Sequence, residues 1–250
     1  MVATSGERYA VVSCHVERPL DDAVWERYRR LLEARPGGFA VASLVRPADP
    51  DAGEDEDRWL ERVRSLAEHG PLGHHTHWTA PGHARPVDGR TGDRVRAEGW
   101  TLREAGLAPT LFCGGGWYTD VDVAEACAEL GYVDCTPRAS RPPYLAGGER
   151  WASLQEPAEV ALPSGRILTA IPTTHSLGDL VRAFRGRGPL PALTHVYFHD
   201  TDLLERRRRA LVRVLLPLLA RRARPTDLDV LAFRTPVTER RVAWDDVARL

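Results

Sequence analysis

The stretch Gly73-His74-His75-Thr76-His77-Trp78 places three histidines within four residues, directly after a short apolar approach. We expect this stretch to be a strand, and in a strand residues i and i+2 project to the same side, so His75 and His77 can approach one ion together. Neutral imidazole is the commonest metal ligand in proteins. A histidine-rich surface loop is the alternative for so short a pattern, so the rest of the chain has to decide between them.

Short apolar runs alternate with longer amphipathic runs on both sides of this stretch, which is typical of parallel strands joined by helices. Further strands are expected at 9–14, 39–45, 109–112, 132–135, 194–198 and 228–233, with a hairpin at 160–162 and 166–170. Helices are expected at 23–34, 58–69, 93–105 and 121–130, and after His175. The chain therefore has roughly seven βα-like units without a repeat or linker, and we expect a single domain over residues 1–250.

A further helix, long and basic, is expected behind Asp202, with Asp202 and Glu205 as a capping box and Pro217 bending or dividing it. The proline- and glycine-rich segment 80–91 is long for a connection between a strand and a helix. We expect that segment to fold over a site as a lid.

Composition limits the function classes. The formal net charge of −1 argues against a nucleic-acid binder, whose phosphate contacts require a basic face. No segment approaches the roughly 18 to 20 consecutive apolar residues of a membrane span, and the N-terminus lacks a signal-peptide pattern. The four cysteines show no Cys-x-x-Cys pairing, which suits reduced thiols. We expect a cytoplasmic protein that binds a small molecule and neither nucleic acid nor membrane; its oligomeric state is not predicted.

Polar side chains with metal-binding or proton-transfer chemistry follow several of the expected strands. These are His15 and Glu17, His75 and His77, the segment 113–117, Asp134, and His199. Catalytic groups of parallel α/β sheets and barrels gather at the C-terminal ends of the strands. The pattern therefore favours the metal site over the surface loop.

Taken in order, these segments resemble the NodB-like polysaccharide deacetylases, or carbohydrate esterase family 4, and especially their intracellular relatives. The resemblance runs from about Tyr9 to about Phe233 and rests on Cys14-His15-Val16-Glu17, Gly73-x-His75-Thr76-His77, Phe112-Cys113-Gly114-Gly115-Gly116-Trp117 and Val196-Tyr197-Phe198-His199. It implies an α/β fold of the distorted (β/α)7-type barrel class. It also implies one divalent ion, expected to be Zn²⁺, and removal of acetyl from N-acetylated sugars.

The resemblance assigns the metal ion to Glu17, His75 and His77. The family's second histidine would stand four residues after His75, where this chain has a threonine. His77 is therefore taken as the substitute ligand, with His83 or His74 as alternatives.

Two positions depart from the family pattern together. His15 stands where the family has a catalytic Asp, and Cys113 where it has an Arg. An arginine that pairs with a carboxylate has no purpose beside an imidazole and would repel its protonated form. We expect His15 to be the base and His199 the acid that protonates the leaving amine; alternatively, the site has kept binding and lost hydrolysis.

Substrate contacts are expected from Trp117, Gly115, Asp134 and His175, with a backbone N–H of the glycine turn facing the developing oxyanion. Three function classes remain open. The first is a metal-dependent N-deacetylase or related hydrolase of a C–N amide bond in a small sugar derivative or specialised metabolite. The others are a metal-assisted lyase or cyclase on a repurposed barrel, and a catalytically silent binding protein.

Overall fold

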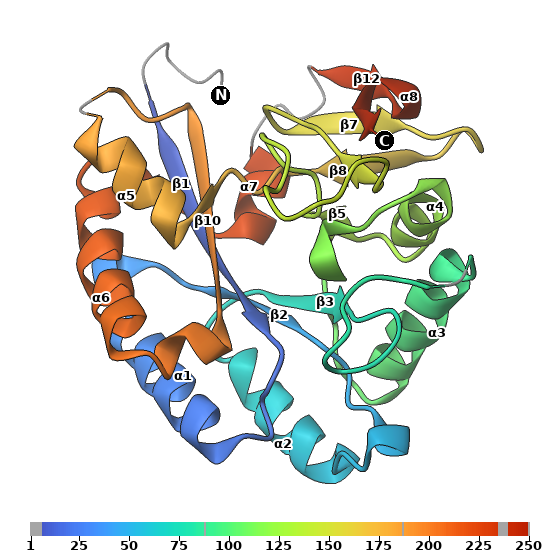
Figure 1. Ribbon diagram of the computed structural model, residues 1–250, viewed down its shortest axis with the longest axis horizontal. Coiled ribbons are helices and arrows are strands. Elements are labelled where there is room, and N and C mark those ends of the chain that lie inside the picture. The colour runs from blue at the N-terminus through green and yellow to red at the C-terminus, as the bar shows by residue number, and fades with distance from the viewer. Residues whose placement is uncertain (1–6, 88, 187, 235–239, 250) are drawn as a thin grey trace.

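The computed structural model describes residues 7–87, 89–186, 188–234 and 240–249 (Figure 1). Its main sheet is mostly parallel, in the order β12-β7-β8-β5-β4-β3-β2-β1-β10-β9. The strands are β1 Tyr9–Val16, β2 Ala42–Val45, β3 Leu72–Thr76, β4 Leu111–Gly114, β5 Val133–Asp134, β6 Trp151–Ala152, β7 Ala158–Ala161, β8 Ile167–Ala170, β9 His175–Ser176, β10 Leu193–His199, β11 Arg224–Pro225, β12 Arg241–Ala243 and β13 Ala248–Arg249.

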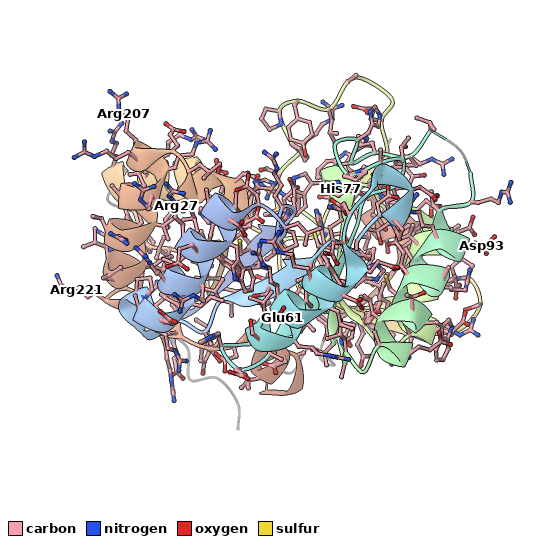
Figure 2. All side chains as sticks on the ribbon, turned by 90° about the horizontal axis from the view of Figure 1, so that it is seen from below. Arg27, Glu61, His77, Asp93, Arg207 and Arg221 are labelled. Atoms are coloured by element: carbon pink, nitrogen blue, oxygen red, sulfur yellow. The ribbon has the colours of Figure 1, made fainter. Side chains whose placement is uncertain are left out.

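Helices surround this sheet, as Figure 1 shows. They are α1 Asp22–Ala34, α2 Glu56–Leu66, α3 Thr91–Glu104, α4 Val121–Glu129, α5 Leu177–Arg185, α6 Arg206–Ala220, α7 Leu228–Arg234 and α8 Trp244–Val247. The described residues also form 3₁₀ turns at Pro36–Gly38, Pro50–Ala52, Gly115–Trp117 and Asp200–Leu203. Figure 2 shows Arg207 and Arg221 extending outward on the side of α6, whereas His77 is buried.

The segment between β8 and β9 joins the two sides of the sheet. Thr173 N donates to Pro137 O at 2.8 Å beyond β5, and Thr174 N donates to His195 O at 3.1 Å in β10. Seven strands or strand segments therefore surround one interior: β1, β2, β3, β4, β5, the β8–β9 segment and β10. The prediction of a single α/β domain of the distorted (β/α)7 barrel type is confirmed.

Side chains of β1 alternate between the barrel interior and the surrounding helices. Val11 packs with Leu44 and Leu111 inside the barrel, whereas Val12 and Cys14 pack in the cluster that α1, α2 and α6 cover. Because side chains of a strand alternate with a period of two, residues 15 and 17 project toward the inside, like Val11. The alternation therefore delivers the polar residues after β1 to the mouth of the barrel.

The last predicted strand, 228–233, is wrong: these residues belong to helix α7. Leu228 and Leu231, three positions apart, pack into the interior cluster that contains Val11 and Leu111. A short apolar run fits a buried strand and a buried helix equally well. Here the run is apolar because α7 packs against the interior of the barrel.

The helix behind Asp202 also differs from the prediction. Asp202 accepts from His199 N at 3.1 Å within the 3₁₀ turn 200–203, and Glu205 at the start of α6 makes no side-chain capping bond. Pro217 lies inside α6, which continues as one helix to Ala220. The predicted hairpin is confirmed, because β7 and β8 pair antiparallel.

Among the described residues, no helix is long and apolar enough to cross a membrane.

Candidate metal centre and pocket

Three strands bring the histidines of the predicted site together. Residues 15 and 199 are direct register partners of the parallel strands β1 and β10. His75 lies in β3, His77 follows it, and Glu17 follows β1. We call His15, His75, His77 and His199 the histidine cluster; it lies at the C-terminal mouth of the barrel.

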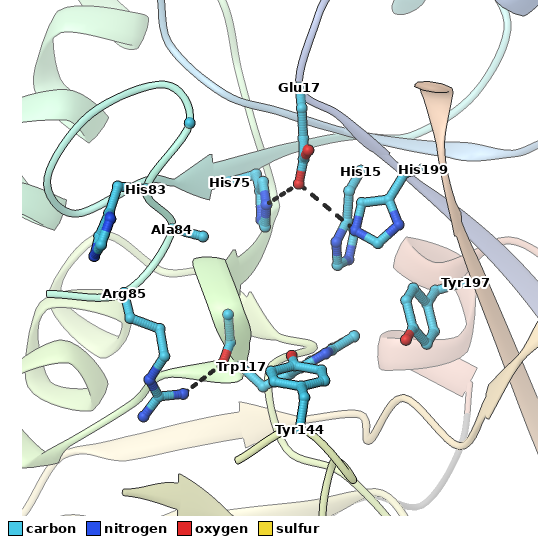
Figure 3. A pocket seen from close by; sticks show the side chains of 12 residues that line it. His15, Glu17, His75, His83, Ala84, Arg85, Trp117, Tyr144, Tyr197 and His199 are labelled. Atoms are coloured by element: carbon cyan, nitrogen blue, oxygen red, sulfur yellow. Dashed lines mark hydrogen bonds and ion pairs between the residues drawn. The ribbon is translucent and has the colours of Figure 1, made fainter. Parts of the chain in front are cut away.

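A pocket of about 430 Å³ opens at this mouth, which is within the usual size range of small-molecule sites. Its lining residues are His15, Glu17, His75, Gly82, His83, Ala84, Arg85, Gly116, Trp117, Tyr144, Tyr197 and His199. Figure 3 shows Glu17 pointing between His75 and His199. Segment 82–85 forms one wall, so the expected lid does border the pocket.

Glu17 lies at the centre of the cluster. Its Oε1 is 3.7 Å from His75 Nε2, 3.4 Å from His77 Nε2 and 3.6 Å from His199 Nε2. These distances exceed the usual 2.7–3.2 Å of an N–H···O hydrogen bond. The carboxylate is therefore surrounded by imidazole nitrogens without being bonded closely to them.

Backbone carbonyls fix the protonation of two of these imidazoles. Nδ1 of His75 bonds Cys113 O at 2.7 Å, and Nδ1 of His77 bonds Pro81 O at 2.7 Å. A carbonyl only accepts, so each Nδ1 carries the proton and donates. In the neutral ring, Nε2 is then left with a lone pair, which is how metal-ligating histidines are commonly oriented.

The lone pairs of the cluster lack donors. Nε2 of His15, His75 and His77 is buried in each case and has no hydrogen-bond partner among the residues that the structure describes. The ionised carboxylate of Glu17 also only accepts. Acceptors that face one another across such gaps fit a cation, and Glu17, His75 and His77 offer three ligand atoms within 4.8 Å of one another.

Electrostatics keeps these groups in the forms that bind metals. Burial lowers the pKa of His75, although its contact with Glu17 opposes this shift. Burial raises the pKa of Glu17, but its contacts with His75 and His77 lower it more, and its pKa ends well below the usual range. A neutral imidazole and an ionised carboxylate are the forms that bind a divalent ion.

His15 is buried beside two other members of the cluster. Its ring centroid is 4.4 Å from that of His75 and 5.1 Å from that of His199. Burial, with the nearby His75 and His199 rings, lowers the pKa of His15 well below its usual value. His15 also forms possible ligand groups with Glu17 and His199, and with His75 and Cys113.

Cys113 is a poor participant in either chemistry. Burial raises the pKa of its thiol well above the usual value, and the neighbouring Cys135 and Asp134 add to the shift. The thiolate is the form that attacks or binds a metal. Cys113 therefore packs in the barrel interior, in the position where the family has an arginine.

The two alternative ligands lie apart from the ion-binding groups. His74 faces outward from β3, where its Nε2 is 2.8 Å from Glu98 Oε2 and 2.9 Å from Thr76 Oγ1. His83 lines the pocket but belongs to none of the possible ligand groups found among the described residues. Neither joins Glu17 at the centre.

Only one of the expected substrate contacts lies in the pocket wall. Trp117 lines the pocket, whereas Gly115, Asp134 and His175 are not among its lining residues. A Cβ at Gly115 would lie 2.5 Å from Thr76 O and 3.1 Å from the ring of His77, so glycine there permits close packing against the histidine strand. The carboxylate of Asp134 accepts a hydrogen bond from the backbone N–H of Thr136, two residues later.

Two pocket residues, Tyr144 and Tyr197, and a guanidinium behind them, Arg138, had not been predicted from the sequence. Tyr197 lies two positions before His199 in β10 and therefore projects to the same side of the strand. This alternation could have predicted Tyr197 as a pocket residue. Tyr144 and Arg138 lie in the irregular stretch after β5, where no periodic pattern marks them. Arg85, also in the pocket, is paired with Glu149 at 3.0 Å.

Comparison with known proteins gives similarity of fold only. No protein-family model matches the chain, and no curated protein sequence is similar to it. Among solved structures, 4-α-glucanotransferase from Thermococcus litoralis aligns over 92% of this chain with a TM-score of 0.55 and 13% identity. The aligned part covers 40% of that enzyme, so this chain spans less than half of its length.

A second solved structure is similar over nearly its whole length. It is a family 4 carbohydrate esterase from Streptomyces lividans in complex with acetate, with a TM-score of 0.50 and 14% identity. The alignment covers 94% of this chain and 97% of the esterase. The fold expected from the motif resemblance is thus found in a solved member of that family.

Proposed function

We propose that this protein is a metal-dependent hydrolase that removes an acetyl or related acyl group from the nitrogen of a small sugar derivative or specialised metabolite. One observation carries the proposal: three buried Nε2 atoms without partners, in His15, His75 and His77, surround an acceptor-only carboxylate at the mouth of the barrel. The similarity in fold to a family 4 carbohydrate esterase supports it.

Glu17, His75 and His77 would hold the ion. Two imidazoles and a carboxylate are a ligand set typical of catalytic zinc, and three protein ligands leave positions open. A divalent ion held there would lower the pKa of a water toward about 7 and polarise the substrate carbonyl. Cys113 O and Pro81 O, which hold the two rings by Nδ1, would keep the ligands oriented.

His15 is the proposed base. Its lowered pKa keeps it neutral near pH 7, and its Nε2 is free to accept a proton. His199 is the proposed acid for the leaving amine, because its side chain is 35% exposed and lies across Glu17 from His75. The backbone N–H of Gly116, which lines the pocket, would stabilise the oxyanion.

The aromatic rings of Trp117 and Tyr197 would contact the substrate. They lie 4.7 Å apart between centroids at an angle of 79° and line one side of the pocket. Asp134 and His175 lie outside the pocket lining and have no part in the proposed site.

The test is acetate release from N-acetylglucosamine derivatives by the zinc-loaded full chain. We expect release by the wild type, at least a hundredfold less from His15→Ala, and unchanged zinc content in that variant. If zinc binds but no N-acetylated substrate releases acetate, the hydrolase is wrong and a lyase or cyclase becomes the better hypothesis. If neither occurs, the protein is a binding protein.

A further inference from the structure

Arg138 lies behind the aromatic side of the pocket. Its backbone is fixed in the irregular stretch after β5, where its N donates to Ala152 O at 2.9 Å and its O accepts from Leu154 N at 3.1 Å. Its guanidinium carbon lies 4.5 Å from the ring centroid of Trp117 and 4.9 Å from that of Tyr197. Both rings line the pocket, whereas Arg138 lies against them and is not itself a lining residue.

The charge of Arg138 has no counter-charge in the part of the chain that the structure describes. The residue is 5% exposed, Nε and Nη1 are enclosed without hydrogen-bond partners, and no described carboxylate lies within ion-pair distance. Cation–π contacts are weaker than the free-energy penalty of burying an ion, so the two rings compensate only part of that penalty.

Arg46 shows how the same chain accommodates a buried arginine whose role is structural. It is 4% exposed, and its guanidinium pairs with Glu54 at 2.5 Å and donates to Glu17 O and Pro47 O. Arg138 is buried to a similar extent and has none of these partners among the described residues. A bound anion would supply the missing partner.

The field of Arg138 acts on the pocket wall. Burial raises the pKa of Tyr144 and Tyr197, and the positive charge of Arg138 opposes both shifts. Glu17 is the one carboxylate among the lining residues, and the proposed cation uses it. With that cation bound to Glu17, the charge of Arg138 would be left for an anionic ligand to neutralise.

We propose that Arg138 binds an anionic group, a carboxylate or a phosphate, of the ligand that occupies this pocket. The guanidinium fork matches either group with two parallel hydrogen bonds. Nη2 is not among the buried nitrogens without partners, and the first contact of the anion is proposed at this atom. Insofar as the ligand is the substrate, the inference rests on the proposed function and makes that substrate an acidic sugar derivative.

The test uses D-glucuronate, D-glucose 6-phosphate and neutral D-glucose as probes, titrated calorimetrically into the full chain after chelation of metal. Chelation removes any attraction of the anions to a bound ion. We expect one of the charged sugars to bind the wild type at least tenfold more tightly than glucose, a ratio that Arg138→Gln abolishes. Which charged sugar binds distinguishes a carboxylate site from a phosphate site.

Arg103→Gln is the matched control, because Arg103 also lies over two rings, at 5.2 Å from Trp100 and 5.7 Å from Tyr132, away from the pocket. It should retain the preference for the charged sugar. If Arg138→Gln does not fold, Arg138→Lys keeps the charge without the fork and should lose most of the preference.

The inference is overturned if both charged sugars bind no tighter than glucose, or if their preference survives in Arg138→Gln. The proposed function fails separately: an Arg138-dependent preference in a protein that releases no acetate keeps the anion site and removes the hydrolase. Conversely, acetate release by a wild type that shows no preference for the charged sugars keeps the hydrolase and removes the anion site.

Discussion

Strand β3 has a buried histidine on each face. The two faces differ in how closely the imidazole approaches a carboxylate. On the outer face, His74 Nε2 is 2.8 Å from Glu98. On the inner face, His75 and His77 stand 3.7 and 3.4 Å from Glu17, with their protons held on the far nitrogen by backbone carbonyls. The outer imidazole and carboxylate are bonded to each other without a ligand, although His74 Nδ1 has no hydrogen-bond partner among the described residues. The inner imidazoles and carboxylate face one another without a positive partner.

Burial and residue type alone therefore do not identify a metal ligand. His74 is fully buried, like His75, and lies next to it in the sequence. What distinguishes them is the direction of the proton: an imidazole whose Nδ1–H is already used can offer only a lone pair to the carboxylate. A divalent ion is the group that such an arrangement can bind.

The largest expected effect is on metal affinity. His77→Ala removes one of three ligands and should weaken zinc binding at least a hundredfold, because the remaining pair no longer encloses the ion. Competition with a chromophoric chelator measures this. His74→Leu is the control from the opposite face and should keep wild-type affinity; equal losses in both variants would remove the distinction between the faces.

Metal should also stabilise the fold. Zinc at a hundred times its dissociation constant should add about 2.7 kcal/mol to the free energy of unfolding. In Glu17→Gln this increment should disappear while the metal-free protein becomes more stable than metal-free wild type, because the amide can donate to an Nε2 lone pair. Chemical denaturation with and without chelator measures both, and a less stable metal-free variant would contradict the acceptor-only description of the cluster.

A third prediction concerns His195, a buried histidine whose Nε2 is 2.9 Å from Ser13 Oγ. Burial lowers its pKa to about 3, against 6.5 ordinarily, so the unfolded chain binds the proton more readily. Its contribution to stability is therefore complete above about pH 6.5 and is lost as the pH falls toward 3. Between pH 6.5 and 5 the wild type should lose about 2 kcal/mol from this residue.

His195→Gln removes that titration and should flatten the stability profile over the same interval, as measured by denaturation at several pH values. The metal-binding affinity at pH 7 should not change. An equally steep profile in the variant would show that other groups cause the loss.

The smallest expected effect is on the outer face of β3. His74→Leu removes the donor to Glu98, which retains Arg94 at 2.7 Å, and should lower the free energy of unfolding by about 1–2 kcal/mol. Thermal unfolding of the chelated protein measures this loss. A loss that appears only in the zinc-loaded protein would place His74 in the metal site instead.

The sequence predicted those site residues that follow from local periodicity. The alternation of β3 pairs His75 with His77, and the ends of β1 and β10 place His15, Glu17 and His199 at the same mouth. The same rule failed to exclude Asp134, because β5 has only two residues and gives too short a pattern to show which face a side chain takes.

Other parts of the structure depend on contacts that no local pattern contains. The apolar run 228–233 is helical because the interior of the barrel accepts Leu228 and Leu231. The environment of Arg138 is made by Trp117 and Tyr197, which lie in distant segments of the chain. Composition and spacing carry no information about such long-range packing.

The most direct measurement is an anomalous-difference map from crystals of the full chain grown with zinc. The proposed centre predicts one strong peak at about 2.0–2.2 Å from His75 Nε2, His77 Nε2 and a Glu17 carboxylate oxygen. A map without a peak among these three residues, or with the peak held by His74 or His83, would contradict it.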